Sequence, residues 1–344
     1  MRLFPSSRML RTLAPALLAA ALLPAIAGAA AKPAPAASAS TASPPVPLLW
    51  KVSDADNAIY LLGSFHVLKA DDYPLSKDID AAFDDAEALA FEIAPEEMTS
   101  PQLGMAMAKA ALRTDGKRLG DTLPPETAKQ FDAWVAANGD ALMKTGLPGP
   151  ALQMFEPWFA GMIVSLTEMG KFGLDPANGL DMRMIQRAAG ASKPATGLEL
   201  GSDQIALFDG MDPDQQVQFL QESLGDAEGA RQEIEKLHAD WRRGDAKALW
   251  NGMAADMRAK YPALYQRINV ARNDAWVPKL QRMLDDAHGK DTLVVVGSLH
   301  LLGSDGVVEK LRARGYRVER ICLACTSPAR RAPAATAPAA RSRN

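Results

Sequence analysis

Short runs of apolar residues, bounded by turn-forming residues, occur near both ends of this chain and predict β-strands. They cover residues 48–52, 59–62, 88–93, 292–296 and 316–323. Between them, over roughly residues 101–287, apolar positions recur at helical spacing and predict helices over 126–138, 155–170, 180–189, 212–224, 227–243 and 274–287. Strands so far apart must pair to enclose one core. The pattern therefore predicts an α/β domain with a mixed central sheet from the N- and C-terminal halves and a long helical insertion.

One sequence unit occurs twice. The run Ile59-Tyr-Leu-Leu-Gly-Ser-Phe-His66 matches Val294-Val-Val-Gly-Ser-Leu-His300, since each copy has an apolar strand, Gly-Ser, one apolar residue and a histidine. The copies lie at opposite ends of the predicted domain. We therefore expect two half-sites that face each other across a pseudo-two-fold repeat of the sheet.

The two ends of the chain differ in composition from its body. Residues 1–31 combine a basic start, a short apolar run and small residues, which is the pattern of a secretory signal peptide. A disordered Ala- and Pro-rich linker is expected over 32–47 and a disordered tail over 326–344, flanking one domain over 48–325. No other apolar run reaches the roughly 20 residues that a membrane helix needs. We expect export across the inner membrane, a periplasmic location and no transmembrane helix after signal cleavage.

Composition narrows the classes of function. Of 344 residues, 48% are apolar and 23% charged, which is typical of a globular protein. Residues 48–325 carry 30 basic and 41 acidic side chains, and so acidic a body excludes nucleic acid as a partner. Cys322 and Cys325 are the only cysteines, too few for a disulfide framework or a four-thiolate zinc module. In an oxidising periplasm we expect these two to form a local disulfide.

The repeated histidines are the strongest candidates for chemistry. The chain has four histidines, and His66 and His300 occupy the same place in the repeat. Each follows a glycine at the end of an apolar strand, so each is expected at the carboxyl end of a strand, where open α/β sheets bind ligands. The other two are not expected to carry chemistry: His238, on a charged amphipathic helix beside Trp241, is expected at the surface or in rim packing, and His288 in a solvated polar turn.

Glu92 lies near the end of a third apolar run, where a buried carboxylate needs a charged partner or a metal ion. The alternative is an outward-facing side chain on a half-exposed strand. If Glu92 lies beside His66 and His300, the three donors suit a divalent metal ion such as Mn, Co or Zn and leave coordination positions open for water. Such a water ionises near neutral pH and attacks a carbonyl group.

Several motifs, taken in order over roughly residues 48–321, resemble the TraB/GumN family, whose fold group includes the Tiki proteases and, more distantly, erythromycin-esterase and ChaN-like proteins. They are Gly63-Ser-Phe-His66, Phe91-Glu92, Gly179-Leu-Asp181, Gly197-Leu-Glu199, Ala271-Arg272-Asn273 with Trp276, and Val296-Gly297-Ser-Leu-His300. The resemblance implies that the paired Gly-x-x-His motifs and an acidic residue after the first of them form the active site, which is metal-dependent in Tiki-like members. Carried over, it assigns His66, Glu92 and His300. It implies no particular substrate.

Three further residues are candidates with open alternatives. Arg272 either orients Glu92 or stabilises an oxyanion, unless it is a surface arginine at a helix start. Glu199, after a predicted strand, is either a general base or additional metal ligand, or a capping or surface carboxylate. Asp181 is expected mainly to stabilise a helix dipole.

These observations leave three functions open. The first is a periplasmic metal-dependent hydrolase that cleaves an amide or ester bond in a peptide or small molecule. The second is a metal-independent esterase in which His66 or His300 acts as general base. The third is a protein without enzymatic activity that binds haem or a metal ion, as the resemblance to ChaN-like proteins suggests.

Overall fold

The computed structural model describes residues 43–225, 227–285 and 289–326. The predicted signal peptide, the linker up to residue 42, His288 and the tail from residue 327 lie outside the described residues. The last part of the predicted linker is packed, because Val46 is buried and its N–H donates to the carbonyl of Arg242. Packed structure thus begins before Leu48.

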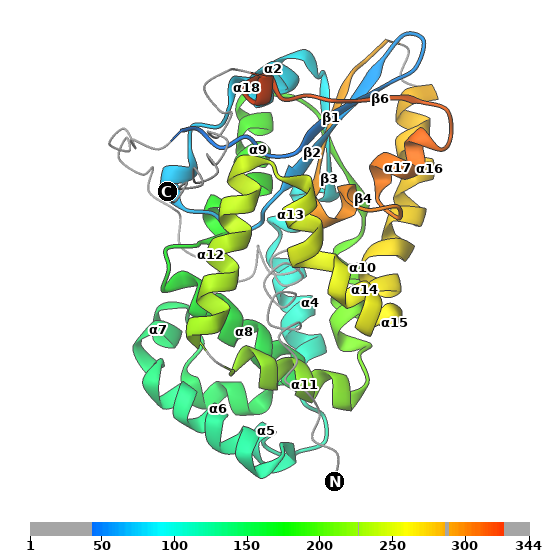
Figure 1. The fold of residues 1–344 in the computed structure, drawn as a ribbon. Coiled ribbons are helices and arrows are strands. Elements are labelled where there is room, and N and C mark those ends of the chain that lie inside the picture. Colours follow the sequence, from blue (N-terminus) through cyan, green and yellow to red (C-terminus); the bar gives the residue numbers. More distant parts are fainter. Residues whose placement is uncertain (1–42, 226, 286–288, 327–344) are drawn as a thin grey trace, which may run out of the picture.

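The core is a six-stranded mixed sheet of order β4-β3-β5-β2-β1-β6, which confirms the predicted α/β fold (Figure 1). Its strands β2, β5, β3 and β4 are parallel, and β1 and β6 complete one edge by antiparallel pairing. The two central strands, β2 and β5, are buried at every position, which is why they appear in the sequence as continuous apolar runs. The strands are β1 (Leu49–Ser53), β2 (Ala58–Ser64), β3 (Ala88–Ile93), β4 (Ala195–Glu199), β5 (Thr292–Gly297) and β6 (Arg317–Arg320).

The repeated motifs lie side by side. Strands β2 and β5 are neighbours and run parallel, with Ser64 paired to Gly297. The two motifs therefore present the same edge of the sheet, one strand apart. The expected pseudo-two-fold repeat is not confirmed, because neighbouring parallel strands are related by a shift across the sheet.

The segment between β3 and β5 is mostly helical, as predicted, but it also contributes the edge strand β4. In Figure 1, helices α5 to α8 and α11 gather below the sheet, and α12 runs from this lower part up to it. The longer helices are α2 (Lys77–Asp85), α4 (Pro101–Ala111), α6 (Pro125–Ala137), α8 (Pro157–Gly170), α9 (Leu180–Gly190), α10 (Gly201–Asp209), α11 (Pro213–Ser223), α12 (Ala227–Arg243) and α16 (Ala271–Asp285).

Shorter helical elements connect these. The α-helical ones are α3 (Pro95–Met98), α5 (Leu119–Thr122), α7 (Gly139–Lys144), α13 (Ala246–Trp250), α14 (Asp256–Lys260), α15 (Pro262–Tyr265), α17 (Val307–Arg312) and α18 (Leu323–Thr326). The 3-10 turns are η1 (Ala70–Asp72), η2 (Gly149–Met154), η3 (Pro176–Asn178) and η6 (Ser298–Leu301). Two π-helical turns, η4 (Asn251–Ala255) and η5 (Gln266–Val270), flank α14 and α15.

Helix α12 holds the segment that follows β2. Trp241 donates from its indole to the carbonyl of Gly63 at 3.0 Å, and its ring lies against Phe65. One turn earlier, His238 lies 2.7 Å from Asp72, which also pairs with Arg242. His238 is buried, whereas the sequence predicted a surface or rim position, because its partner is a buried carboxylate contributed by a distant turn, which helical periodicity does not reveal.

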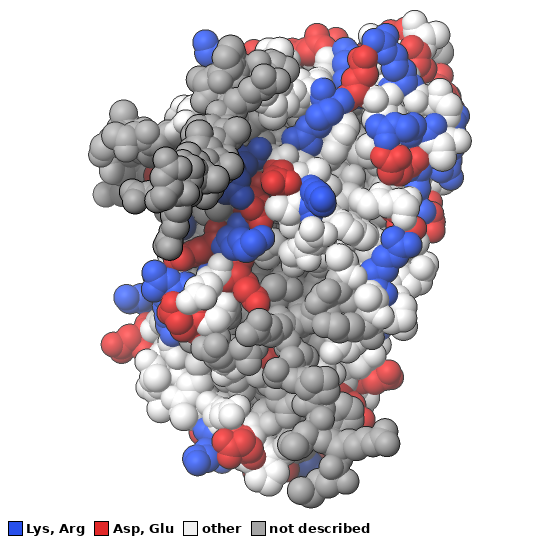
Figure 2. Space-filling view, viewed as in Figure 1, with Lys and Arg blue, Asp and Glu red and all other residues white. Residues whose placement is uncertain are grey.

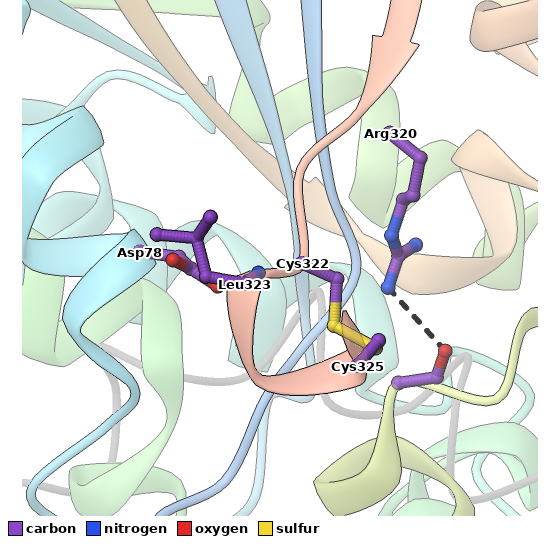
Figure 3. Close-up of a disulfide and its surroundings, with 6 residues drawn as sticks. Asp78, Arg320, Cys322, Leu323 and Cys325 are labelled. Carbon is purple, nitrogen blue, oxygen red and sulfur yellow. Dashed lines mark hydrogen bonds between the residues drawn. A yellow bond between two sulfur atoms is a disulfide. The ribbon is translucent and has the colours of Figure 1, made fainter. Parts of the chain in front are cut away.

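The chain leaves the sheet through a local disulfide. Cys322 and Cys325 are bonded, as expected, in a turn after β6 (Figure 3). The N–H of Leu323 donates to Asp78 on α2 at 2.8 Å, and Arg320 donates to the carbonyl of Gly244. These contacts attach the end of β6 to helices on either side.

The charged surface is mixed in sign. On the face in Figure 2, basic and acidic side chains of the described residues lie interspersed. Within the described ranges, no helix is both long and apolar enough to cross a membrane.

Candidate functional site

The candidate residues meet at the carboxyl edge of the four parallel strands. His66 lies two residues after β2, Glu92 is next to last in β3, Glu199 ends β4, and His300 lies in the turn η6 after β5. Parallel neighbours end at the same edge of a sheet, so this topology alone gathers the residues at one place.

Glu92 stands between the two histidines. Its Oε1 atom is 3.8 Å from Nε2 of His66 and 3.9 Å from Nε2 of His300. All three side chains are buried, so they face one another rather than solvent. The structure thus brings together two imidazoles from opposite ends of the chain and one carboxylate.

Gly297 borders the space between these groups. A Cβ atom at this position would lie 3.0 Å from Nε2 of His66, 3.2 Å from Oε1 of Glu92 and 3.6 Å from Cδ2 of His300. The backbone of Gly297, with φ −51° and ψ 136°, suits any residue, so the glycine is needed here for space. The three side chains can therefore approach one another this closely because residue 297 has no side chain.

Asp181 fixes His66. Its Oδ1 atom accepts from Ser64 at 2.8 Å and lies 3.1 Å from Nδ1 of His66, so Nδ1 carries the proton and Nε2 is directed toward Glu92. Burial disfavours the charged imidazole, but the charge and hydrogen bond of Asp181, with the charge of Glu92, raise the pKa of His66. Gly179, just before α9, allows this approach, because a Cβ there would be 2.2 Å from the carbonyl oxygen of His66.

Asn273 fixes His300 in the same way. The Oδ1 atom of Asn273 is 2.7 Å from Nδ1 of His300, and the ring of Trp276 lies against the imidazole with centroids 4.4 Å apart. Since Oδ1 can only accept, Nδ1 carries the proton and Nε2 is left as a hydrogen-bond acceptor. Burial and then the positive charge of Arg272 lower the pKa of His300 to about 3, so this imidazole is neutral at physiological pH.

Arg272, in the first turn of α16, lies between two carboxylates. Its Nη2 donates to Glu92 and to Glu199, each at 2.6 Å. Its Nε donates to both oxygens of Glu199, and its Nη1 donates to the carbonyl of Ile268 and, at 3.0 Å, to Nε2 of His300. The five N–H groups of the guanidinium are thus directed at protein acceptors. This arrangement favours a role in orienting Glu92 over direct binding of a substrate oxyanion.

These contacts determine the ionisation of Glu92. Burial by itself would raise the pKa of this carboxyl, but the charge of Arg272, with smaller effects from the two histidines and the Gly297 N–H, holds the pKa far below its usual range. Glu92 is therefore a carboxylate throughout the physiological range.

Glu199 anchors the guanidinium. Besides Arg272, its oxygens accept from the indole of Trp276 at 3.0 Å and from Gln204 at 2.8 Å. Gln204 also donates to Glu92 at 3.1 Å and so bridges the two carboxylates. Glu199 is separated from the imidazoles by Arg272, which favours a positioning role over that of a general base.

Sequence reasoning assigned no site role to Asn273 or Gln204 and expected of Asp181 mainly a helix-dipole effect. Asp181 does lie in the first turn of α9, but it is buried against His66. Two features of the sequence could have indicated these roles. Asp181 belongs to the Gly179-Leu-Asp181 motif, and Asn273 directly follows Arg272. Nothing in the sequence around Gln204 distinguishes it from other helical glutamines.

The donor atoms beside Gly297, two imidazole nitrogens and a carboxylate oxygen, suit a divalent ion in type. Histidine ligands usually donate their second ring N–H to an acceptor, as both imidazoles do here. Donors at about 2.1 Å from one tetrahedral ion lie ~3.4 Å apart, near the two observed separations from Oε1 of Glu92. In this arrangement, however, no group of three or more His, Cys, Asp or Glu in the described ranges is placed to hold a metal ion. Binding an ion here requires Arg272 to release Nε2 of His300.

Comparison with known proteins identifies the family. The profile of the TraB/PrgY/gumN family matches residues 48–320, which include every site residue above. The chain belongs to this family. No solved structure matches it significantly.

Two relatives illustrate its range. Protein YbaP of Escherichia coli K12 is 27% identical over 164 residues, which are 47% of this chain and 59% of YbaP. The metalloprotease TIKI1 of zebrafish is 23% identical over 314 residues, which cover 79% of this chain and 62% of TIKI1. The chain thus spans about three fifths of the length of these members of the TraB/PrgY/gumN family.

Proposed function

We propose that this chain is a hydrolase that cleaves an amide or ester bond with a water molecule held among His66, Glu92 and His300. The observation that carries the proposal is the convergence of His66, Glu92 and His300 beside Gly297, where an added Cβ would contact all three side chains. The similarity to a protein named as a metalloprotease supports hydrolysis as the reaction class.

We further propose that a divalent metal ion assists the reaction, with Nε2 of His66, Nε2 of His300 and Oε1 of Glu92 as its ligands. When bound, such an ion supplies Lewis acidity, which ionises water near neutral pH and polarises a carbonyl group. The chain's own residues prepare this site. Asp181 and Asn273 hold the two Nδ1–H groups, and Arg272 keeps Glu92 ionised.

The contact between Arg272 and His300 supports one alternative, which is hydrolysis without a metal ion. Here Arg272 is the resident cation, and an imidazole Nε2 atom takes the proton from water. Either imidazole can supply this base, and Nε2 of His300 becomes available for it only when Arg272 moves away from its lone pair.

The test combines elemental analysis with a panel of peptide and ester substrates, on protein purified from the periplasm, where we propose that it acts. We expect close to one divalent ion per chain, and His66→Ala and His300→Ala should each lose both the ion and hydrolysis. Glu92→Gln should be inactive, whereas Glu96→Gln, a change of an exposed carboxylate in α3, should behave as wild type. A normal metal content in both histidine variants contradicts the metal site. Hydrolysis that survives exhaustive chelation selects the metal-free alternative.

A further inference from the structure

A line of polar side chains runs from His300 away from the candidate site. Nδ1 of His300 donates to Oδ1 of Asn273 at 2.7 Å, and Nδ2 of Asn273 donates to Oδ1 of Asn269 at 3.3 Å. Nδ2 of Asn269 donates to the Tyr265 hydroxyl at 3.0 Å, which donates to Oδ2 of Asp305 at 3.4 Å. We call these residues, from His300 to Asp305, the Asp305 chain.

The direction of every hydrogen bond in the Asp305 chain follows from its far end. The carboxylate of Asp305 can only accept, so the single hydroxyl proton of Tyr265 is directed at it and Asn269 must donate to the hydroxyl oxygen. The carbonyl of Asp305 can only accept as well, and it receives Nδ2 of Asn273 at 2.8 Å. Oδ1 of Asn273 therefore faces His300. All the donors point the same way, from the imidazole toward a negative charge.

Local structure places these residues together. Tyr265, Asn269 and Asn273 recur every fourth residue from the end of α15, through the π-helical turn η5, into α16. Single π-helical turns inside α-helices are frequent at functional sites. Both asparagines are fully buried, where an amide without hydrogen-bond partners would be costly.

Asp305 is brought back to this helix by a tight loop after His300. Gly303 in that loop has φ +73°, and a Cβ there would be 2.3 Å from the ring of Trp250. Only glycine suits both conditions. Arg258 lies 3.4 Å from Oδ2 of Asp305 and donates to Ser304, which ties the carboxylate to α14 at the protein surface.

We infer that Tyr265 and Asp305 are positioning residues for His300, acting through Asn269 and Asn273 to hold its imidazole in the Nδ1–H tautomer, with Nε2 left as the acceptor that faces Arg272. Hydrogen bonds aligned head to tail polarise one another, so the carboxylate at the far end increases electron density on the imidazole. The consequence for water activation rests on the proposed function. The placement and tautomer of His300 do not, because they follow from contacts within the chain.

The test is nuclear magnetic resonance of protein with ¹⁵N-labelled histidine, without added metal or substrate. Correlations from ring protons to both nitrogens should identify His300 as the Nδ1–H tautomer, and His300→Gln should remove these signals and so assign them. In Tyr265→Phe and in Asp305→Asn, the Nδ1–H proton should move upfield because its hydrogen bond weakens. Tyr261→Phe removes a hydroxyl from the residue one turn before Tyr265, outside the Asp305 chain, and should leave the signal in place.

A second readout links the inference to catalysis. If the proposed hydrolysis is found, Tyr265→Phe should lower kcat by about 10-fold with KM unchanged, as changes to residues behind a reacting imidazole commonly do. Asp305→Asn provides the same test if Tyr265→Phe does not fold. A His300 ring protonated on Nε2, or a Nδ1–H signal that both folded variants leave unmoved, overturns the inference. Absence of hydrolysis in the wild-type protein would contradict the proposed function and leave the resonance result intact.

Discussion

The N–H of Gly297, at the end of β5, donates a 2.7 Å hydrogen bond to Oε1 of Glu92 on the adjacent strand β3. The same oxygen faces Nε2 of His66 and of His300. Gly297 thus holds the carboxylate through its main chain and leaves the space beside it open by lacking a side chain. Substitution can separate the two effects, because only the open space depends on the absence of Cβ.

Gly297→Ala is therefore expected to remove activity and to keep the fold. The new methyl group enters the space between the imidazoles and the carboxylate, while the N–H donor stays in place. We expect hydrolysis to fall by about 100-fold, since displacements near 1 Å at reacting groups have effects of this size. Stability should fall by about 1 kcal/mol in urea denaturation. Gly190→Ala, where no atom lies within 4 Å of the added Cβ, is the matched control. Full activity in Gly297→Ala would show that this space is not used.

Asp181→Asn should reduce the function of the site but not abolish it. The amide oxygen can still accept from Nδ1 of His66, but the negative charge that raises the pKa of this imidazole is lost. The pKa of His66 should therefore fall toward or below its usual value, which a titration of its ring signals measures. Activity or metal affinity should decrease about 10-fold. Asp84→Asn, at an exposed position, should change neither. A His66 pKa that stays raised in Asp181→Asn would contradict the assigned cause.

Arg272→Lys tests the fork of donors between the two carboxylates. Lysine keeps the positive charge but cannot reach Glu92, Glu199 and His300 together, so buried acceptors lose partners. We expect a loss of about 3 kcal/mol in the free energy of unfolding, as for other broken buried ion pairs. Arg282→Lys, at an exposed position of the same helix, should be neutral. An unchanged free energy of unfolding in Arg272→Lys would show that the burial of Glu92 and Glu199 does not require the hydrogen bonds of the guanidinium.

Asp72 makes the attachment of α12 dependent on pH. Burial would raise the pKa of this carboxyl, but the hydrogen bond and charge of His238, the Lys69 N–H and Arg242 together lower it. A lowered pKa in the folded state stabilises the protein above the unfolded value near pH 4, and this contribution is lost as pH falls through the folded pKa. Asp72→Asn should therefore cost about 3 kcal/mol at pH 7. The difference in the free energy of unfolding between Asp72→Asn and wild type should become smaller in acid. Urea denaturation at pH 7 and pH 3 measures it, and a difference that grows in acid would contradict this sign.

Some elements have signals within their own segment of sequence, and others do not. The predicted strand over residues 88–93 and the predicted helix over 227–243 coincide with β3 and α12, because continuous apolar runs and helical periodicity are local signals. The same periodicity placed the start of α16 at residue 274 instead of Ala271. Arg272 and Asn273 thus lie on a buried helical turn that the local pattern did not include.

By itself, the sequence determined most of the strands and helices, and that the Gly-Ser-x-His unit occurs twice at the ends of apolar runs, because these properties depend on residues close together in the chain. Tertiary structure alone decided that Ser64 pairs with Gly297, that Asp181 and Asn273 hold the two imidazoles, and that Arg272 separates Glu92 from Glu199. Each of these contacts joins residues far apart in the sequence. Their distance in space depends on strand order and helix packing, which no local pattern of side chains encodes.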